Sequence, residues 1–99
     1  MSKDTRKLAL LDAAMTEARK CGYNRVTREQ IAARAECAPG LISFYFGTMQ
    51  QMKRAIMSEA IRTRNLPIIA QGLADKHPKA MRAPVELRTA AAMTLAGVV

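Results

Sequence analysis

Several residue types are scarce in this sequence, and each shortage narrows the possible structure. The 99 residues include no tryptophan, two phenylalanines and two tyrosines, so aromatic residues make up 4% of the chain. Because Ala, Leu, Ile and Met supply much of the apolar content and β-branched residues are few, the composition favours helices over strands. The length suits one domain, and we therefore expect an all-α fold in which helix packs on helix.

The sequence also lacks a long apolar run. Its N-terminus is charged, and the apolar stretch that follows is interrupted by Asp12. Such a segment fits neither a signal peptide nor a membrane span. We expect a cytoplasmic protein without a membrane partner, and we find no internal repeat.

Metal-binding and catalytic patterns are missing as well. Cys21 and Cys37 are sixteen residues apart, and the single histidine, His77, follows forty residues later. Zinc sites need closely spaced ligand pairs. The sequence contains no nucleophile-elbow pattern and no glycine-rich phosphate loop. We expect no metal, no cofactor and no enzymatic activity, and we expect both thiols to be small buried residues in a reducing cytosol.

Positive charge is what the sequence has in excess. Sixteen Lys and Arg residues stand against eight Asp and Glu, which gives a net charge of +8 and a pI near 10.2. Such an excess indicates a polyanionic partner, usually nucleic acid or an anionic surface. The alternative reading is that the charge serves solubility alone.

Glycine and proline divide the chain into six expected helices. Their ranges are 5–21, 27–35, 39–46, 48–65, 68–74 and 84–99. Asp4 is the expected cap of the first helix, and Gly22 is expected to end it in a left-handed turn. Pro67 disfavours helical geometry at Leu66, so the fourth helix should stop near residue 65. The stretch 76–79 reads as a basic connection.

Helix starts and inward faces follow from local patterns. Thr27 to Gln30 and Thr48 to Gln51 each fit a capping box. Apolar residues recur at helical spacing in every expected helix. The expected inward residues are Leu8, Leu11, Met15, Ala18, Ile31, Ala35, Ile42, Phe46, Met52, Ile56, Ala60, Leu87, Ala91, Leu95 and Val98.

The two short helices at 27–35 and 39–46 have the chemistry of a helix-turn-helix. In that motif the second helix enters the DNA major groove. Pro39 and Gly40 are small enough for a close backbone approach, and Ser43 and Tyr45 offer hydroxyl groups. Three consecutive aromatic residues end the second helix, so at least one of them must be exposed.

A run of residues at fixed spacing then resembles a known family. The matching stretches are Leu11-Asp12-Ala13-Ala14, Cys21-Gly22-Tyr23, Val26-Thr27, Ile31-Ala32-Ala33-Arg34-Ala35, Ala38-Pro39-Gly40-Leu41-Ile42 and Tyr45-Phe46-Gly47. Over residues 8–61 the sequence resembles the N-terminal domain of the tetracycline-repressor (TetR) family. The resemblance implies a three-helix DNA-binding domain with a linking fourth helix over 1–65, followed by a short helical extension over 66–99.

The resemblance also implies which residues contact DNA. The helix starting at Thr27 and the Thr48 region would bind the backbone, and the second helix of the motif would bind the groove. The expected DNA-binding residues are Thr27, Arg28, Ala38, Pro39, Gly40, Leu41, Ser43, Phe44, Tyr45, Thr48 and Lys53. The chain departs from the family pattern at three positions: Glu36 replaces a turn glycine, Ser43 a tyrosine and Met49 a lysine. Lys53 and Arg54, one turn on, are candidates to replace the missing lysine.

Only about thirty residues follow Pro67, and this suggests how the chain works. We expect no conventional inducer pocket and no small-molecule inducer, because such pockets need walls from several long elements. The last helices are expected to pair two subunits into a homodimer or, alternatively, to cap the core of a monomer. The expected function is a sequence-specific transcriptional repressor that binds double-stranded DNA, of a kind reminiscent of phages or mobile elements.

Two other functions fit the same residues. One is a protein-binding module that inhibits a protein partner through its exposed aromatic residue. The other is sequence-neutral DNA packaging driven by charge.

Overall fold

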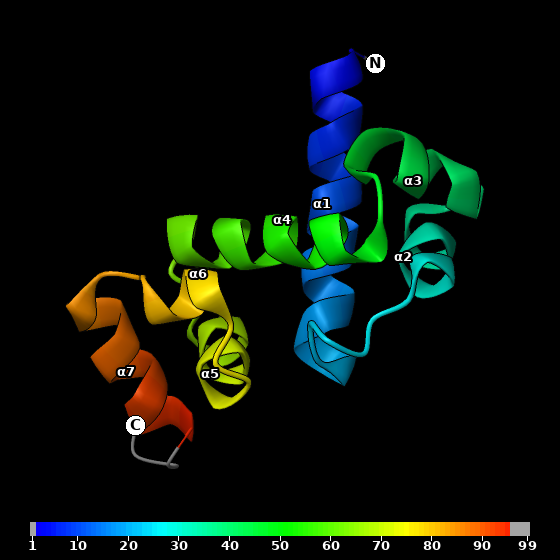
Figure 1. Ribbon diagram of the computed structural model, residues 1–99. Coiled ribbons are helices and arrows are strands. Elements are labelled where there is room, and N and C mark those ends of the chain that lie inside the picture. Colours follow the sequence, from blue (N-terminus) through cyan, green and yellow to red (C-terminus); the bar gives the residue numbers. More distant parts are fainter. Residues whose placement is uncertain (1, 96–99) are drawn as a thin grey trace. The chain divides into compact units, whose positions relative to one another are not determined.

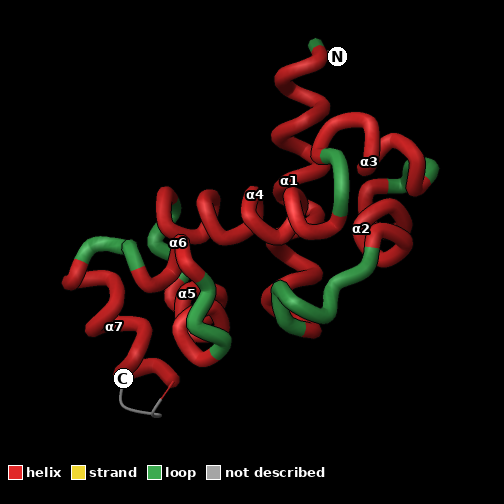
Figure 2. The backbone as a smooth tube through the Cα atoms, in the orientation of Figure 1, coloured by secondary structure: helices red, strands yellow, loops and turns green. Residues whose placement is uncertain are grey.

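The computed structural model describes residues 2–95, and this part of the chain is helical with no strand. The predicted all-α fold is therefore confirmed. Figure 1 shows the helices, and Figure 2 shows the short loops that join them. The helices are α1 (Lys3–Cys21), α2 (Arg28–Ala35), α3 (Pro39–Phe46), α4 (Met49–Arg62), α5 (Leu66–Ala74), α6 (Pro78–Met81) and α7 (Val85–Leu95).

The chain forms two compact units that meet within α4. The first comprises Met1–Ile56 and the second Met57–Val99. The first unit therefore holds α1, α2, α3 and the start of α4, and the second holds the end of α4 and the three remaining helices. The sequence places the domain boundary at residue 65, where the fourth helix is expected to end. This boundary stays a prediction.

Helix α1 begins earlier than expected, and its buried face matches the predicted one only in part. Its cap is Ser2 rather than Asp4, because the Ser2 hydroxyl accepts a hydrogen bond from the Thr5 amide at 3.1 Å. Gly22 ends the helix with a φ of 98°, a conformation that suits glycine. Met15 and Ala18 are buried as predicted, whereas Leu8, also expected inside, is 60% exposed and Leu11 is half-buried. Leu10 and Ala14 are buried in their place. Alanines let the neighbouring helix come close, so this face packs in preference to the leucine stripe.

Helices α2 and α4 start at the predicted capping boxes. Thr27 and Gln30 exchange hydrogen bonds at 2.9 and 3.1 Å, and Thr48 and Gln51 do so at the same distances. Helix α1 packs against α2, and α2 against α3. Ala35, expected inside, is only half-buried. The buried apolar residues of this unit are Leu10, Ala13, Ala14, Met15, Ala18, Tyr23, Val26, Ile31, Ala32, Ile42, Phe46, Met52 and Ile56.

The junction after α4 differs from the expectation. Helix α4 ends at Arg62, three residues early, and Arg64 takes a left-handed conformation with a φ of 56°. The Asn65 side chain accepts a hydrogen bond from the Ile68 amide at 3.4 Å and caps α5. Leu66 is therefore helical despite the following proline. In the first turn of a helix, Pro67 has no intrahelical partner to lose, so the helix tolerates it.

The second unit contains one more helix than the sequence predicted. The expected connection at 76–79 includes the start of the four-residue helix α6, which His77 caps by accepting a hydrogen bond at Nδ1 from the Lys79 amide at 3.1 Å. Helix α5 packs against α6 and α7. Leu87 and Ala91 are buried as predicted, whereas Val98 and the side chain of Leu95 lie outside the described residues. The buried residues of this unit are Met57, Ala60, Ile68, Ile69, Ala70, Gly72, Ala80, Ala83, Leu87 and Ala91.

Within the described residues, no helix is both long and apolar enough to cross a membrane.

Candidate nucleic-acid interface

The turn between α2 and α3 has the predicted unusual residue at its first position. Glu36 is left-handed, with φ 56° and ψ 49°, and its amide donates to the carbonyls of Ala32 and Ala33. The Cys37 amide also donates to the Ala32 carbonyl, at 3.0 Å. These hydrogen bonds satisfy the last carbonyls of α2. The left-handed conformation that allows them costs a non-glycine residue about 1 kcal/mol. The turn that connects α2 to α3 therefore has Glu36 at a left-handed position that glycine would adopt more easily.

The N-terminus of α2 presents hydrogen-bond donors. The capping box occupies the amides of Thr27 and Gln30, and the amides of Arg28 and Glu29 have no partner within the helix by geometry. Thr27 is exposed, and its hydroxyl hydrogen remains able to donate. Nε of Arg28 is buried and has no hydrogen-bond partner. Free amides and cationic donors at a helix N-terminus suit an anion such as a phosphate.

Helix α3 divides its residues between the core and the surface. Ile42 and Phe46 are buried, as predicted. The start of the helix, from Ala38 to Gly40, is exposed, and a Cβ added at Gly40 would meet nothing within 4 Å. Leu41, Ser43 and Tyr45 are half-buried. The exposed side of α3 thus carries small residues at its start and aromatic residues at its end.

The aromatic end of α3 lies beside the first turns of α1 (Figure 1). Phe44 is 69% exposed, which confirms that one of the three aromatic residues faces outward. Its ring meets that of Tyr45 edge to face, with 5.2 Å between the centroids. Nζ of Lys3 lies 5.6 Å from the centre of the Phe44 ring, and Nζ of Lys7 lies 5.5 Å from that of Phe46. Sequence reasoning missed these two lysines, although their i, i+4 spacing places them on one face.

A shallow hollow marks the same place. It measures about 540 Å³ and is lined by Lys3, Asp4, Lys7, Phe44 and Tyr45. Two lysines and one aspartate make its rim positively charged. An anionic ligand with a flat apolar part would match this combination of cations and rings.

The start of α4 carries the remaining predicted site residues. Thr48 is exposed, and the amides of Met49 and Gln50 have no partner within the helix by geometry. Met49 and Lys53 are half-buried, whereas Arg54 is exposed. Of the two candidates to replace the family's lysine, Arg54 is thus the more accessible.

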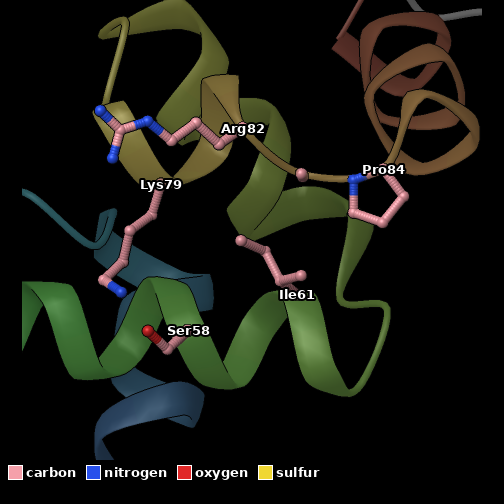
Figure 3. A pocket seen from close by; sticks show the side chains of 6 residues that line it. Ser58, Ile61, Lys79, Arg82 and Pro84 are labelled. Atoms are coloured by element: carbon pink, nitrogen blue, oxygen red, sulfur yellow. The ribbon is translucent and has the colours of Figure 1, made fainter.

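The second unit has a hollow of its own, of about 330 Å³. Its lining residues are Ser58, Ile61, Lys79, Arg82, Ala83 and Pro84. Figure 3 shows the side chain of Lys79 extending toward Ser58, and that of Arg82 extending away from Ile61. Its volume is at the lower end of the range for small-molecule sites. Among the described residues, its charged lining consists of Lys79 and Arg82, so its charge favours anions over cations.

The cysteines do not assemble a metal centre. Cys21 and Cys37 are half-buried rather than buried, and Sγ of Cys21 donates to the Glu17 carbonyl at 3.1 Å. In the described part of the chain, no three His, Cys, Asp or Glu residues are grouped so that they could hold a metal ion.

Most of the chain's first half and the start of its second match a known protein family. Residues 10–56 match the family model described as "Bacterial regulatory proteins, tetR family". This segment runs from the middle of α1 to the first half of α4 and includes both helices of the predicted motif. No curated protein and no solved structure matched the chain.

Proposed function

We propose that the chain is a sequence-specific repressor that binds double-stranded DNA through residues 10–56, the segment that matches the tetR family of bacterial regulatory proteins. The observation that carries this proposal is the match over α2 and α3, together with the exposed, small-to-aromatic face that α3 presents. A regulator that covers a promoter in this way blocks transcription by occupying the DNA.

In this proposal α3 enters the major groove. Pro39 and Gly40 let its N-terminus approach the base edges, and Phe44 contacts thymine methyl groups. The Ser43 and Tyr45 hydroxyls donate or accept hydrogen bonds in the groove or at its edge. Because these contacts differ from base to base, α3 carries the sequence preference.

The backbone contacts come from two helix starts. Thr27 and Arg28 at α2, and Thr48 at α4, place donors where phosphates lie on either side of the groove. The unpartnered Nε of Arg28 supports this role, because a buried donor without a partner is costly unless a ligand satisfies it. Lys53 adds charge along α4. These contacts hold the register without reading the sequence.

We further propose that the repressor acts as a homodimer. Two α3 helices related by a two-fold axis read half-sites about one DNA turn, roughly 34–36 Å, apart. A selected binding site should then be a palindrome with that spacing. The absence of a small-molecule inducer, expected from the sequence, stays a prediction.

The test is DNA binding by the purified chain. Duplexes are first selected from a randomised library, and fluorescence anisotropy then compares the selected duplex with a scrambled one across a salt series. A preference of about a thousandfold or more, with a steep salt slope, supports a specific regulator. Tyr45→Ala should reduce this preference, because it removes a hydroxyl and a ring from α3.

Two outcomes would contradict the proposal. Equal binding to both duplexes would favour sequence-neutral packaging. Absence of DNA binding would favour the protein-binding alternative, which the exposure of Phe44 also fits. In that case Phe44→Ala should release a partner protein.

A further inference from the structure

We propose that the first two turns of α1 form a second DNA-backbone contact, made by Lys3, Arg6 and Lys7 beside the groove that α3 enters. We call these three residues the α1 basic patch. The inference rests on the proposed function, since it presupposes that α3 binds DNA. It adds a phosphate-binding surface that lies outside the matched segment, because residues 10–56 do not include it.

The α1 basic patch lies close to the exposed aromatic end of α3. Nζ of Lys3 lies 5.6 Å from the centre of the Phe44 ring, and this ring is 69% exposed. If Phe44 contacts bases in the major groove, a cation at this distance lies at the groove's edge. Phosphates line both edges of a groove about 12 Å wide. Lys3 and Lys7 therefore reach backbone phosphates rather than bases.

The charged groups of the α1 basic patch are accessible to a ligand. Lys3, Arg6 and Lys7 are all exposed. Within the described residues the ion pairs join Arg34 to Glu17 and Arg62 to Glu59, and none involves the α1 basic patch. Asp4 is the one acidic residue that lines the adjoining hollow. Three cations and one carboxylate give residues 3–7 a net charge of +2. Lys3 and Lys7 contact aromatic rings, which do not neutralise their charge.

The three cations lie at the end of α1 where the helix dipole disfavours positive charge. The N-terminus of a helix carries a partial positive charge, so cations in its first turns are unfavourable. Three of them in α1 therefore cost stability that a simple solvated helix would avoid. Positions that break a local rule are where functional residues are expected. A phosphate at this place would remove the repulsion.

The test uses the pair of lysines and a matched pair on the same helix. Lys3→Ala/Lys7→Ala should weaken binding to the selected and the scrambled duplex by the same factor, about tenfold or more at 0.1 M salt. The slope of log affinity against log salt should fall by about 1.8, since each lost phosphate contact contributes about 0.9. The sequence preference should not change.

The control is Arg19→Ala/Lys20→Ala, which removes the same charge from the last turn of α1. That end lies about 20 Å along the helix from the α1 basic patch, beyond the screening length of about 10 Å at 0.1 M salt. The control should change the slope far less. Asp4→Asn should act in the opposite direction and strengthen binding, because it removes the carboxylate beside the lysines.

Folding is monitored by thermal melting, and Lys3→Gln/Lys7→Gln replaces the alanine pair if that pair unfolds. An unchanged salt slope in the lysine pair, with Tyr45→Ala still losing sequence preference, would overturn this inference and leave the proposed function intact. It would also be overturned if Lys3→Ala/Lys7→Ala and Arg19→Ala/Lys20→Ala lost the same affinity and the same salt slope. Such a result would reflect the overall charge of the chain. A wild-type chain that binds no duplex would overturn both.

Discussion

Nη2 of Arg62 donates a hydrogen bond to Oε2 of Glu59 over 3.0 Å, one helical turn apart in α4. This hydrogen bond, with the attraction of the nearby guanidinium, lowers the pKa of the Glu59 carboxyl against a smaller opposing effect of burial. A carboxyl whose pKa is lowered by folding stabilises the folded state above its unfolded pKa of about 4.3, and this stabilisation disappears as the pH falls through the folded pKa.

The pair therefore predicts a pH-dependent effect of Glu59→Gln. At pH 7 the variant should melt about 1–3 °C below the wild type, because a surface pair at i, i+3 is worth little. As the pH falls through the lowered pKa of Glu59, the two melting temperatures should converge. Scanning calorimetry between pH 2.5 and 7 measures this. A difference that stays constant with pH would mean that the charge of Glu59 contributes nothing.

Glu36→Gly is predicted to stabilise the first unit. Glu36 has a φ of 56°, where a side chain is strained and glycine is not. The strain of about 1 kcal/mol is offset in part by glycine's greater freedom in the unfolded chain, about 0.5–1 kcal/mol, so we expect a gain of up to about 0.5 kcal/mol. Urea denaturation measures the free energy of unfolding.

Ala33→Gly is the matched control for this change. Ala33 is exposed within α2, and glycine there should cost about 0.5–1 kcal/mol. Opposite signs for the two substitutions support the strain at Glu36. If both variants lost stability, the left-handed turn would be unstrained.

Local signals were the part of this fold that the sequence predicted best. Both capping boxes formed, because Thr27 and Gln30, like Thr48 and Gln51, are three residues apart and need no tertiary partner. The bounds of α3 were also predicted correctly, from Pro39 at its start and Gly47 after its end.

Errors arose where packing decides between similar local options. Leu8 belongs to an apolar stripe of proper helical spacing, yet the alanine face beside it is buried. The nearness of Lys3 to Phe44 could not be predicted either, because the two residues are 41 positions apart and only tertiary packing joins them. The same holds for the unpartnered Nε of Arg28, which depends on what surrounds the side chain.

Gly72 and Gly40 predict opposite effects of the same substitution. A Cβ at Gly72, in α5, would lie 2.5 Å from Cε of Met57 and 2.8 Å from Cβ of Ala80. The methionine end can move, but the alanine can yield only with its backbone. Gly72→Ala should therefore destabilise the chain by about 1–3 kcal/mol, although alanine favours a helix.

Gly40→Ala serves as the comparison, because its Cβ would enter open space. It should leave stability unchanged or raise it by up to about 1 kcal/mol. If the start of α3 approaches DNA closely, the same variant should bind the selected duplex less tightly. Denaturation and anisotropy on one preparation separate the two effects. Full DNA affinity in Gly40→Ala would show that the backbone does not come close to the groove.

Arg28 predicts a separation of stability from function. Its Nε is buried without a hydrogen-bond partner, and a group of this kind costs about 1–3 kcal/mol. Arg28→Ala should therefore leave the free energy of unfolding unchanged or raise it, against the usual loss for a half-buried residue. The same substitution should weaken binding to selected and scrambled duplexes equally and reduce the salt slope by about 0.9, because a phosphate contact is lost. Lower stability with unaltered DNA binding would make Arg28 a packing residue. A changed sequence preference would instead place its guanidinium on a base edge.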